Sequence, residues 1–227
     1  MMVVLAIVLA ILSAIIKAFP TDTSLSLILQ RADSFQWTAL GDSYASGVGA
    51  GTMDQGSQRC MRFSDAYPRQ MNASTQLPGS PNRIMNNVVC SGAQAQDVLN
   101  HQFYDTVHYP TISDVEQYQF GPRPPFGTPQ IATLSIGGND IDLKGLIFNC
   151  IFQFWPTMSC EDQRALSWSK LNSPNLANNI KAVIDKAMAK GQSGSVGQDF
   201  RLYVTGYGQM FNATTSQCND VTFSVWG

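Results

Sequence analysis

The sequence ALGDSYASGVGAG, residues 39 to 51, joins the end of an apolar run to a turn rich in glycine. The run, residues 35 to 40, has the length and character of a buried β-strand. Ser43 follows it where the strand gives way to the turn, a position that can hold a hydroxyl group clear of the backbone and beside a base. The stretch therefore predicts a strand, a turn and a candidate nucleophile, in that order.

Three further apolar segments predict strands, each bounded by turn or loop residues: residues 84 to 90, 131 to 136 and 200 to 205. Apolar residues at helical spacing predict a helix that begins at Pro174, with Ser173 as its N-cap, and stops at Gly191. A second, weaker helix is expected in residues 93 to 100. Strands that alternate with helices and loops favour parallel pairing. We therefore expect a single α/β domain, with a mostly parallel sheet covered on both faces.

Composition and charge limit the partners of the chain. Its 227 residues can bury one substantial core, and a formal net charge of -2 offers no basic surface for nucleic acid. The apolar run from residue 1 to 16 is followed by small residues near Ala18, which predicts a secretory signal over residues 1 to 18. The alternative is an amino-terminal membrane anchor. We expect a secreted mature chain without a membrane span.

Secretion agrees with the use of cysteine and with two glycosylation motifs. Disulfides persist in oxidising compartments, and the chain has five cysteines, an odd number that leaves one thiol without an intramolecular partner. The motifs NAS and NAT predict surface glycans at Asn72 and Asn212. No cysteine spacing is typical of a zinc site, so no metal is expected.

A long stretch rich in proline and aromatic residues, from residue 104 to 130, predicts a surface excursion. Such segments often wall a ligand pocket. An ordered loop that only covers the edge of the sheet is the alternative.

Ligands of open α/β sheets bind beyond the carboxyl ends of the strands, so the residues after each strand are the candidate site. Gly92 in CSGA can present its backbone N–H to an anion, and Asn139 in SIGGND offers a side-chain amide. With the N–H of Ser43 they make three donors for an oxyanion. The dinucleotide fingerprint fails at Thr52 and the usual nucleophile elbow fails at Ala45, where each requires glycine. No organic cofactor is therefore expected.

The stretches GDSYASGVGAG, CSGA and SIGGND, in this order and at these separations, resemble the first three sequence blocks of the GDSL or SGNH hydrolase family. They are most similar to its secreted microbial esterase and lipase branch, over about residues 35 to 227. The resemblance implies a flavodoxin-like three-layer α/β/α sandwich. It also implies that Ser43 is the nucleophile, with an oxyanion hole made of the Ser43 amide, the Gly92 amide and the Asn139 side chain.

The family's fourth block, D-x-x-H near the carboxyl terminus, supplies the catalytic histidine, and this sequence lacks it. The only histidines are His101 and His108. Residues 105 to 108, DTVH, match the pattern but precede the third strand, so His108 is a disfavoured substitute for the base and both are expected to be solvated loop residues.

Cysteine pairing also suggests that the chain is cut short. Beside the blocks, Cys60 can pair with Cys90 and Cys150 with Cys160, each bridge contributing a few kcal/mol. Cys218 is then left alone, as if its partner lay downstream. The missing histidine and the unpaired Cys218 together lead us to expect a chain cut short before the fourth block.

The expected function is that of a secreted serine hydrolase that cleaves carboxylic esters, of acyl lipids or of acetylated polysaccharides, through an acyl-enzyme on Ser43. A catalytically inactive secreted member, which binds a glycan or ester or has a structural role, is the alternative. An unrelated α/β binding module is a third interpretation. The sequence does not predict the oligomeric state.

Overall fold

The computed structural model describes residues 35–104, 123–194 and 196–208. Its centre is one sheet of four parallel strands in the order β2-β1-β3-β4. The strands are β1 (Gln36–Gly41), β2 (Ile84–Asn87), β3 (Ile131–Ser135) and β4 (Arg201–Val204). All four predicted strands are confirmed, although β2 ends well before its predicted end at Cys90.

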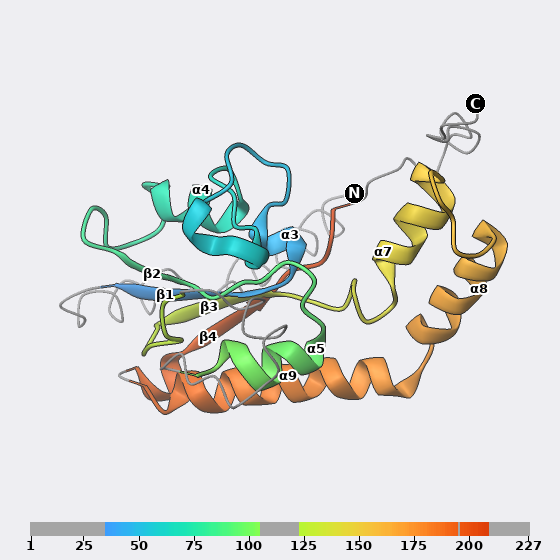
Figure 1. Ribbon diagram of the computed structural model, residues 1–227. Coiled ribbons are helices and arrows are strands. Elements are labelled where there is room, and N and C mark those ends of the chain that lie inside the picture. Colours follow the sequence, from blue (N-terminus) through green and yellow to red (C-terminus); the bar gives the residue numbers. More distant parts are fainter. Residues whose placement is uncertain (1–34, 105–122, 195, 209–227) are drawn as a thin grey trace, which may run out of the picture.

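Helices cover both faces of this sheet. Figure 1 shows α3 and α4 on one face and α5 and α9 on the other, while α7 and α8 stand beyond the carboxyl ends of the strands. The fold is therefore a three-layer α/β/α sandwich with a parallel sheet, as expected. The helices are α3 (Ser43–Ser46), η1 (Gln55–Cys60), α4 (Tyr67–Ala73), α5 (Ala95–Asp97), η2 (Val98–Gln102), α7 (Leu143–Leu146), η4 (Ile147–Phe152), α8 (Cys160–Leu171), α9 (Pro174–Gln192) and η5 (Gly197–Asp199).

Alternation along β1 supplies both halves of the core. Trp37 and Ala39 belong to an apolar cluster on the side of α4, and Leu40 belongs to a second cluster that includes Val183 and Ala187 of α9. Successive side chains of a strand point to opposite faces, so a buried central strand must be apolar on both. Burial of this kind is what fixes β1 at the centre of the sheet.

The long helix α9 begins as predicted and ends close to its predicted stop. The Ser173 side chain caps it by accepting a hydrogen bond from Asn175 N at 3.2 Å, with Pro174 at the first position. Gly191 is the last residue but one of α9, which ends at Gln192, one residue beyond the predicted stop. A Cβ at Gly191 would sit 2.4 Å from the ring of Phe200. Close packing on that ring, rather than helix termination, explains the glycine.

Two disulfides tie the connections together, and both are the pairs suggested by the sequence. Cys60 is bonded to Cys90, which joins the end of η1 to the segment after β2. Cys150 is bonded to Cys160, which joins η4 to the start of α8. Cys218 lies outside the described residues.

Several other expectations fall outside the described residues: the signal segment 1–18, Asn212 and most of the excursion, including His108. Asn72 lies on α4, half-buried, and its Oδ1 accepts a hydrogen bond from Trp37 Nε1 at 3.1 Å. Glycosylation of Asn72 stays a prediction. At the described end of the excursion, the fully buried Phe126 packs into the core. Within the described ranges, no helix has the length and apolar character needed to cross a membrane.

Candidate active site

Ser43 is the first residue of α3, directly beyond the end of β1. Its neighbour Asp42 holds the turn in two ways: its N–H donates to Ser135 O of β3 at 3.1 Å, and its side chain caps α3 by accepting from Tyr44 N at 3.0 Å. The first N–H groups of a helix have no intrahelical acceptor. Ser43 therefore presents both a partly exposed hydroxyl and a backbone donor at the carboxyl edge of the sheet.

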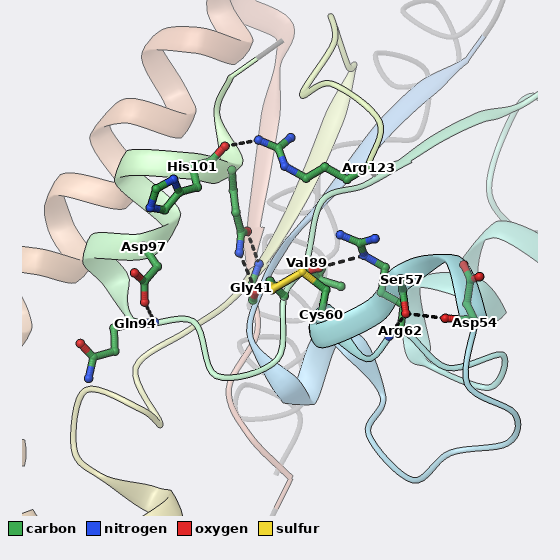
Figure 2. Close-up of a disulfide and its surroundings, with 12 residues drawn as sticks. Gly41, Asp54, Ser57, Cys60, Arg62, Val89, Gln94, Asp97, His101 and Arg123 are labelled. Carbon is green, nitrogen blue, oxygen red and sulfur yellow. Dashed lines mark hydrogen bonds between the residues drawn. A yellow bond between two sulfur atoms is a disulfide. The ribbon is translucent and has the colours of Figure 1, made fainter. Parts of the chain in front are cut away.

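Gly41 has to be glycine for this turn to lie against β3. Its φ is 140°, and a Cβ there would sit 2.3 Å from Ser135 O. The fully buried Gln102 of η2 then clamps Gly41: Gly41 N donates to Gln102 Oε1 at 2.9 Å, and Gln102 Nε2 donates to Gly41 O at 2.8 Å. The two dashed lines at Gly41 in Figure 2 mark this clamp. Sequence reasoning missed Gln102, since an amide that follows Asn100 and His101 gives no signal of burial.

Gly92 lies in an open turn beyond β2. Its φ is 86°, a left-handed value that favours glycine, and a Cβ there would meet nothing within 4 Å. The backbone amides on either side of Gly92 already have acceptors: Ser91 N donates to Cys60 O at 3.0 Å, and Ala93 N donates to Cys90 O at 3.1 Å. No acceptor for the N–H of Gly92 is found in the described part of the chain. That donor is available to a ligand.

The turn that carries Gly92 is held by a disulfide and by a buried arginine. Figure 2 shows the Cys60–Cys90 bond close to Gly41 and, beside it, Arg62, whose Nε donates to Val89 O at 2.9 Å. Burial lowers the pKa of Arg62 to about 10. Because Arg62 anchors the chain next to Cys90, it belongs to the framework beneath the turn.

Asn139 is held against the Gly92 turn. Its Nδ2 donates to Ala93 O at 2.9 Å, and the side chain of the next residue, Asp140, accepts from Ala95 N at 3.1 Å. An amide nitrogen carries two hydrogens, so one donor of Asn139 stays available after the bond to Ala93. The structure thus brings Asn139 and Gly92 together, as the sequence suggested.

Tyr207, three residues after the end of β4, reaches back across this edge and links the Ser43 turn to the Asn139 turn. Its hydroxyl donates to Asp42 Oδ2 and accepts from Gly138 N at 2.8 Å. Its ring meets that of Tyr44 edge-on, with centroids 5.5 Å apart. Burial, reinforced by the neighbouring Asp42 carboxylate, raises the pKa of Tyr207 well above its usual range. Sequence reasoning missed this residue, although its motif GYGQ follows a predicted strand.

Asp42 is a structural carboxylate in this arrangement. Burial raises its pKa, and the hydrogen bond from Tyr207 opposes the shift. Both of its oxygens are engaged, Oδ1 by Tyr44 N and Oδ2 by Tyr207. Asp42 therefore caps and anchors the turn, and it has no oxygen directed at Ser43 as a base.

Of the two histidines, the structure describes His101 alone. It lies on η2 beside Gln102, and it is Gln102 whose side chain reaches the end of β1. Figure 2 shows the imidazole of His101 turned away from Gly41, on the side of Asp97. Among the described residues, no histidine is hydrogen-bonded to Ser43, and no group of three His, Cys, Asp or Glu side chains gathers that could hold a metal ion.

Comparison with known proteins supports a likeness to bacterial lipases. The chain is 30% identical to Lipase 1 of Streptomyces coelicolor over 170 residues, 74% of this chain and 54% of that protein. It is 26% identical to a lipase of Streptomyces rimosus over 162 residues, 71% of this chain and 52% of that protein. The chain thus spans about half the length of the curated relatives it matches. No family model matches it.

Two solved structures have the same fold. Phospholipase A1 from Streptomyces albidoflavus matches with a TM-score of 0.56 and 26% identity, over 79% of this chain and 62% of that one. The extracellular lipase of Streptomyces rimosus matches with a TM-score of 0.53 and 22% identity, over 82% of this chain and 68% of that one. These likenesses support the resemblance to the GDSL or SGNH hydrolases that the three sequence blocks indicated.

Proposed function

We propose that this chain carries the nucleophile and the oxyanion hole of a secreted, lipase-like serine hydrolase that cleaves carboxylic esters. The observation that carries the proposal is the convergence of Ser43, Gly92 and Asn139 at one edge of the sheet. Asp42 is joined to Gly138 through Tyr207, and Asn139 is joined to Ala93 directly. These bonds hold three turns that are far apart in sequence at the same edge of the sheet, which supports a shared role around the Ser43 hydroxyl.

The proposed reaction uses these groups in an ordinary acyl transfer. Ser43 Oγ attacks the ester carbonyl carbon, and the negative charge that develops on the carbonyl oxygen is met by the amides of Ser43 and Gly92 and by Asn139 Nδ2. The carbon–oxygen bond to the alcohol then breaks, and the alcohol leaves with the proton that the Ser43 hydroxyl gave up. Water then hydrolyses the acyl-enzyme, which releases the carboxylic acid and restores the Ser43 hydroxyl. No metal and no organic cofactor takes part.

Lipid esters are the preferred substrates. Relatives of this chain bear the names lipase and phospholipase A1, which supports an acyl lipid over an acetylated polysaccharide. Secretion is supported by the two disulfides, because such bonds persist in oxidising compartments.

The test compares the chain with its Ser43→Ala variant, using a fluorophosphonate probe and a short nitrophenyl ester. We expect the probe to form a covalent adduct on Ser43, located by mass spectrometry, and we expect Ser43→Ala to lose both the adduct and all hydrolysis above buffer. Added imidazole can act as a general base, so it should raise the rate of the wild-type chain more than that of Ser43→Ala. Equal rates for the two proteins at every imidazole concentration would contradict the proposal.

A second candidate function is binding of an ester or glycan without turnover. It is favoured by one observation, that no histidine among the described residues is hydrogen-bonded to Ser43. Residual catalysis can survive the loss of one triad member, so weak hydrolysis alone does not decide between the two. Failure of Ser43 to react with the probe, together with saturable binding of a soluble ester, would favour the binding function.

A further inference from the structure

The residues after β4 return across the carboxyl edge of the sheet. Figure 1 shows this part of the chain beside α3. The hydroxyl of Tyr207 donates to Asp42 Oδ2 and accepts from Gly138 N at 2.8 Å. One side chain therefore contacts both the residue before Ser43 and the residue before Asn139.

The contact with Gly138 depends on the absence of a side chain there. A Cβ at Gly138 would sit 3.1 Å from the Tyr207 hydroxyl oxygen and 3.4 Å from Leu143 Cδ2. A separation of 3.1 Å is closer than ordinary van der Waals contact, so a larger residue would press the hydroxyl away from the backbone N–H. Glycine at this position therefore lets the phenol approach the turn that carries Asn139.

The Asn139 turn and the Gly92 turn are bonded to each other directly. Asn139 Nδ2 donates to Ala93 O at 2.9 Å, and Gln94 Nε2 donates to Asn139 O at 3.3 Å. These bonds fix the two candidate oxyanion donors relative to each other, and they do not involve Ser43. The nucleophile needs a separate connection to this pair.

That connection runs through Tyr207. In the part of the chain that the structure describes, no direct hydrogen bond joins residues 42–46 to residues 138–140, so the two bonds of the phenol make the link. Asp42 N also donates to Ser135 O at 3.1 Å, but Ser135 is the last residue of β3 and lies before the Asn139 turn. Beyond the strand ends, the phenol hydroxyl holds the two turns together.

We propose that the Tyr207 hydroxyl is a positioning group that holds Ser43 and Asn139 at the separation the reaction needs. The proposal rests on the proposed function for the roles of Ser43 and Asn139. The donors of an oxyanion hole act only within hydrogen-bonding distance of the developing charge, and an error of about 1 Å can cost a factor of about 100 in rate. Tyr207 acts through the two turns, because its hydroxyl donates to Asp42 and accepts from Gly138.

The experiment measures how fast Ser43 reacts with a soluble fluorophosphonate in the wild-type chain, in Tyr207→Phe and in Tyr67→Phe. Tyr207→Phe should lower the maximal rate roughly tenfold and leave the half-saturating probe concentration unchanged, because loosened turns still bind the probe but align the donors less often. The matched control is Tyr67→Phe. The Tyr67 ring also lies near Tyr44, with centroids 6.2 Å apart, but its hydroxyl donates to Thr133 Oγ1 within the sheet, so this variant should react like the wild type.

Hydrogen exchange tests the link without any reaction. Tyr207→Phe should speed exchange at Gly138 N, which loses its acceptor, and at Tyr44 N, whose acceptor Asp42 is no longer held by the phenol. Tyr67→Phe should change neither rate. Faster exchange at Gly138 alone would overturn the proposal, because the two turns would then move independently.

The labelling rates give two further outcomes that overturn the proposal. One is a wild-type maximal rate in Tyr207→Phe. The other is a raised half-saturating concentration with an unchanged maximal rate, since Tyr207 would then contact the probe rather than position Ser43. If the wild-type chain shows no labelling of Ser43 at all, the proposed function is contradicted instead, and exchange at Gly138 and Tyr44 still decides whether the phenol holds the two turns together.

Discussion

At the scale of single residues, Tyr207 has the largest consequence for the site, because one hydroxyl joins two of its turns. It donates to Asp42 beside the nucleophile and accepts from Gly138 beside Asn139. A phenylalanine would keep the ring contact with Tyr44 and remove both hydrogen bonds. Tyr207→Phe should therefore lower the free energy of unfolding at neutral pH by about 1.5–3 kcal/mol, since one of the bonds is to a carboxylate.

The pH dependence of stability gives Tyr207 a specific signature. The pKa of Tyr207 is raised in the folded protein, first by burial and then by Asp42, so above about pH 10 the unfolded chain ionises this phenol and the folded one does not. Its contribution is complete below that pH and is lost as the pH rises. The free energy of unfolding, measured with urea at several pH values, should thus fall less steeply with pH in Tyr207→Phe than in the wild type.

Tyr67 and Tyr203 provide the reference points for this measurement. Part of the alkaline fall should persist in Tyr207→Phe, because burial also raises the pKa of Tyr67. The control is Tyr203→Phe, on the half-exposed side of β4, which should reproduce the wild-type slope. Identical slopes in Tyr207→Phe and the wild type would show that the Tyr207 hydroxyl is not buried against Asp42.

At the scale of elements, the π-turn η2 serves as a clamp on the end of β1. Gln102 satisfies both the N–H and the carbonyl of Gly41, the residue that starts the nucleophile turn. Gln102→Leu keeps the volume and leaves the Gly41 N–H buried without an acceptor, which should lower the free energy of unfolding by about 1–3 kcal/mol.

Gln96→Leu is the matched control for this prediction. Gln96 lies on the adjoining α5, is exposed, and bonds only across the helix surface to Asn100 at 3.0 Å. Urea denaturation should show little change for Gln96→Leu and a clear loss for Gln102→Leu. Hydrogen exchange at Gly41 should rise in Gln102→Leu, and an unchanged rate there would contradict the clamp.

Elements with a strong local pattern were predictable from the sequence, and contacts across elements were not. The four strands and α9 follow from apolar runs and from the Ser173–Pro174 start, which act within a few residues. The packing role of Gly191 was missed because it depends on the ring of Phe200, which only the packed structure supplies. Gln102 and Tyr207 were missed for the same cause: each acts through a partner more than sixty residues away.

In the candidate site, too, some residues were predictable from the sequence and some contacts were not. Gly92 and Asn139 follow strands, so the rule that strand ends meet at one edge was enough to bring them together. The buried polar contact between η4 and α8 was not predictable from the sequence pattern, because it depends on Asn149 and Gln163 facing each other from different helices. A helix with a buried polar face has the same sequence periodicity as an ordinary amphipathic helix. The two can be distinguished only when the element that packs against the helix is known.

At the scale of the whole molecule, β4 forms an exposed edge of the sheet. Within the described residues, β4 pairs with β3 alone, and its Tyr203 and Val204 are 50% and 53% exposed. Beside it lies an apolar cavity of about 300 Å³, lined by residues that include Phe35, Met71 and Tyr203. An unpaired edge next to apolar surface is a template for association between chains.

The 227-residue chain is therefore expected to self-associate as its concentration rises, and a charge on the edge should prevent it. Natural edge strands use lysine for this purpose, so Val204→Lys should shift sedimentation velocity profiles toward the monomer. Trp155→Gln serves as the control, since Trp155 is 84% exposed but lies between η4 and α8 rather than on the edge strand. Association that persists in Val204→Lys and disappears in Trp155→Gln would place the contact between chains at Trp155 and would contradict the edge prediction.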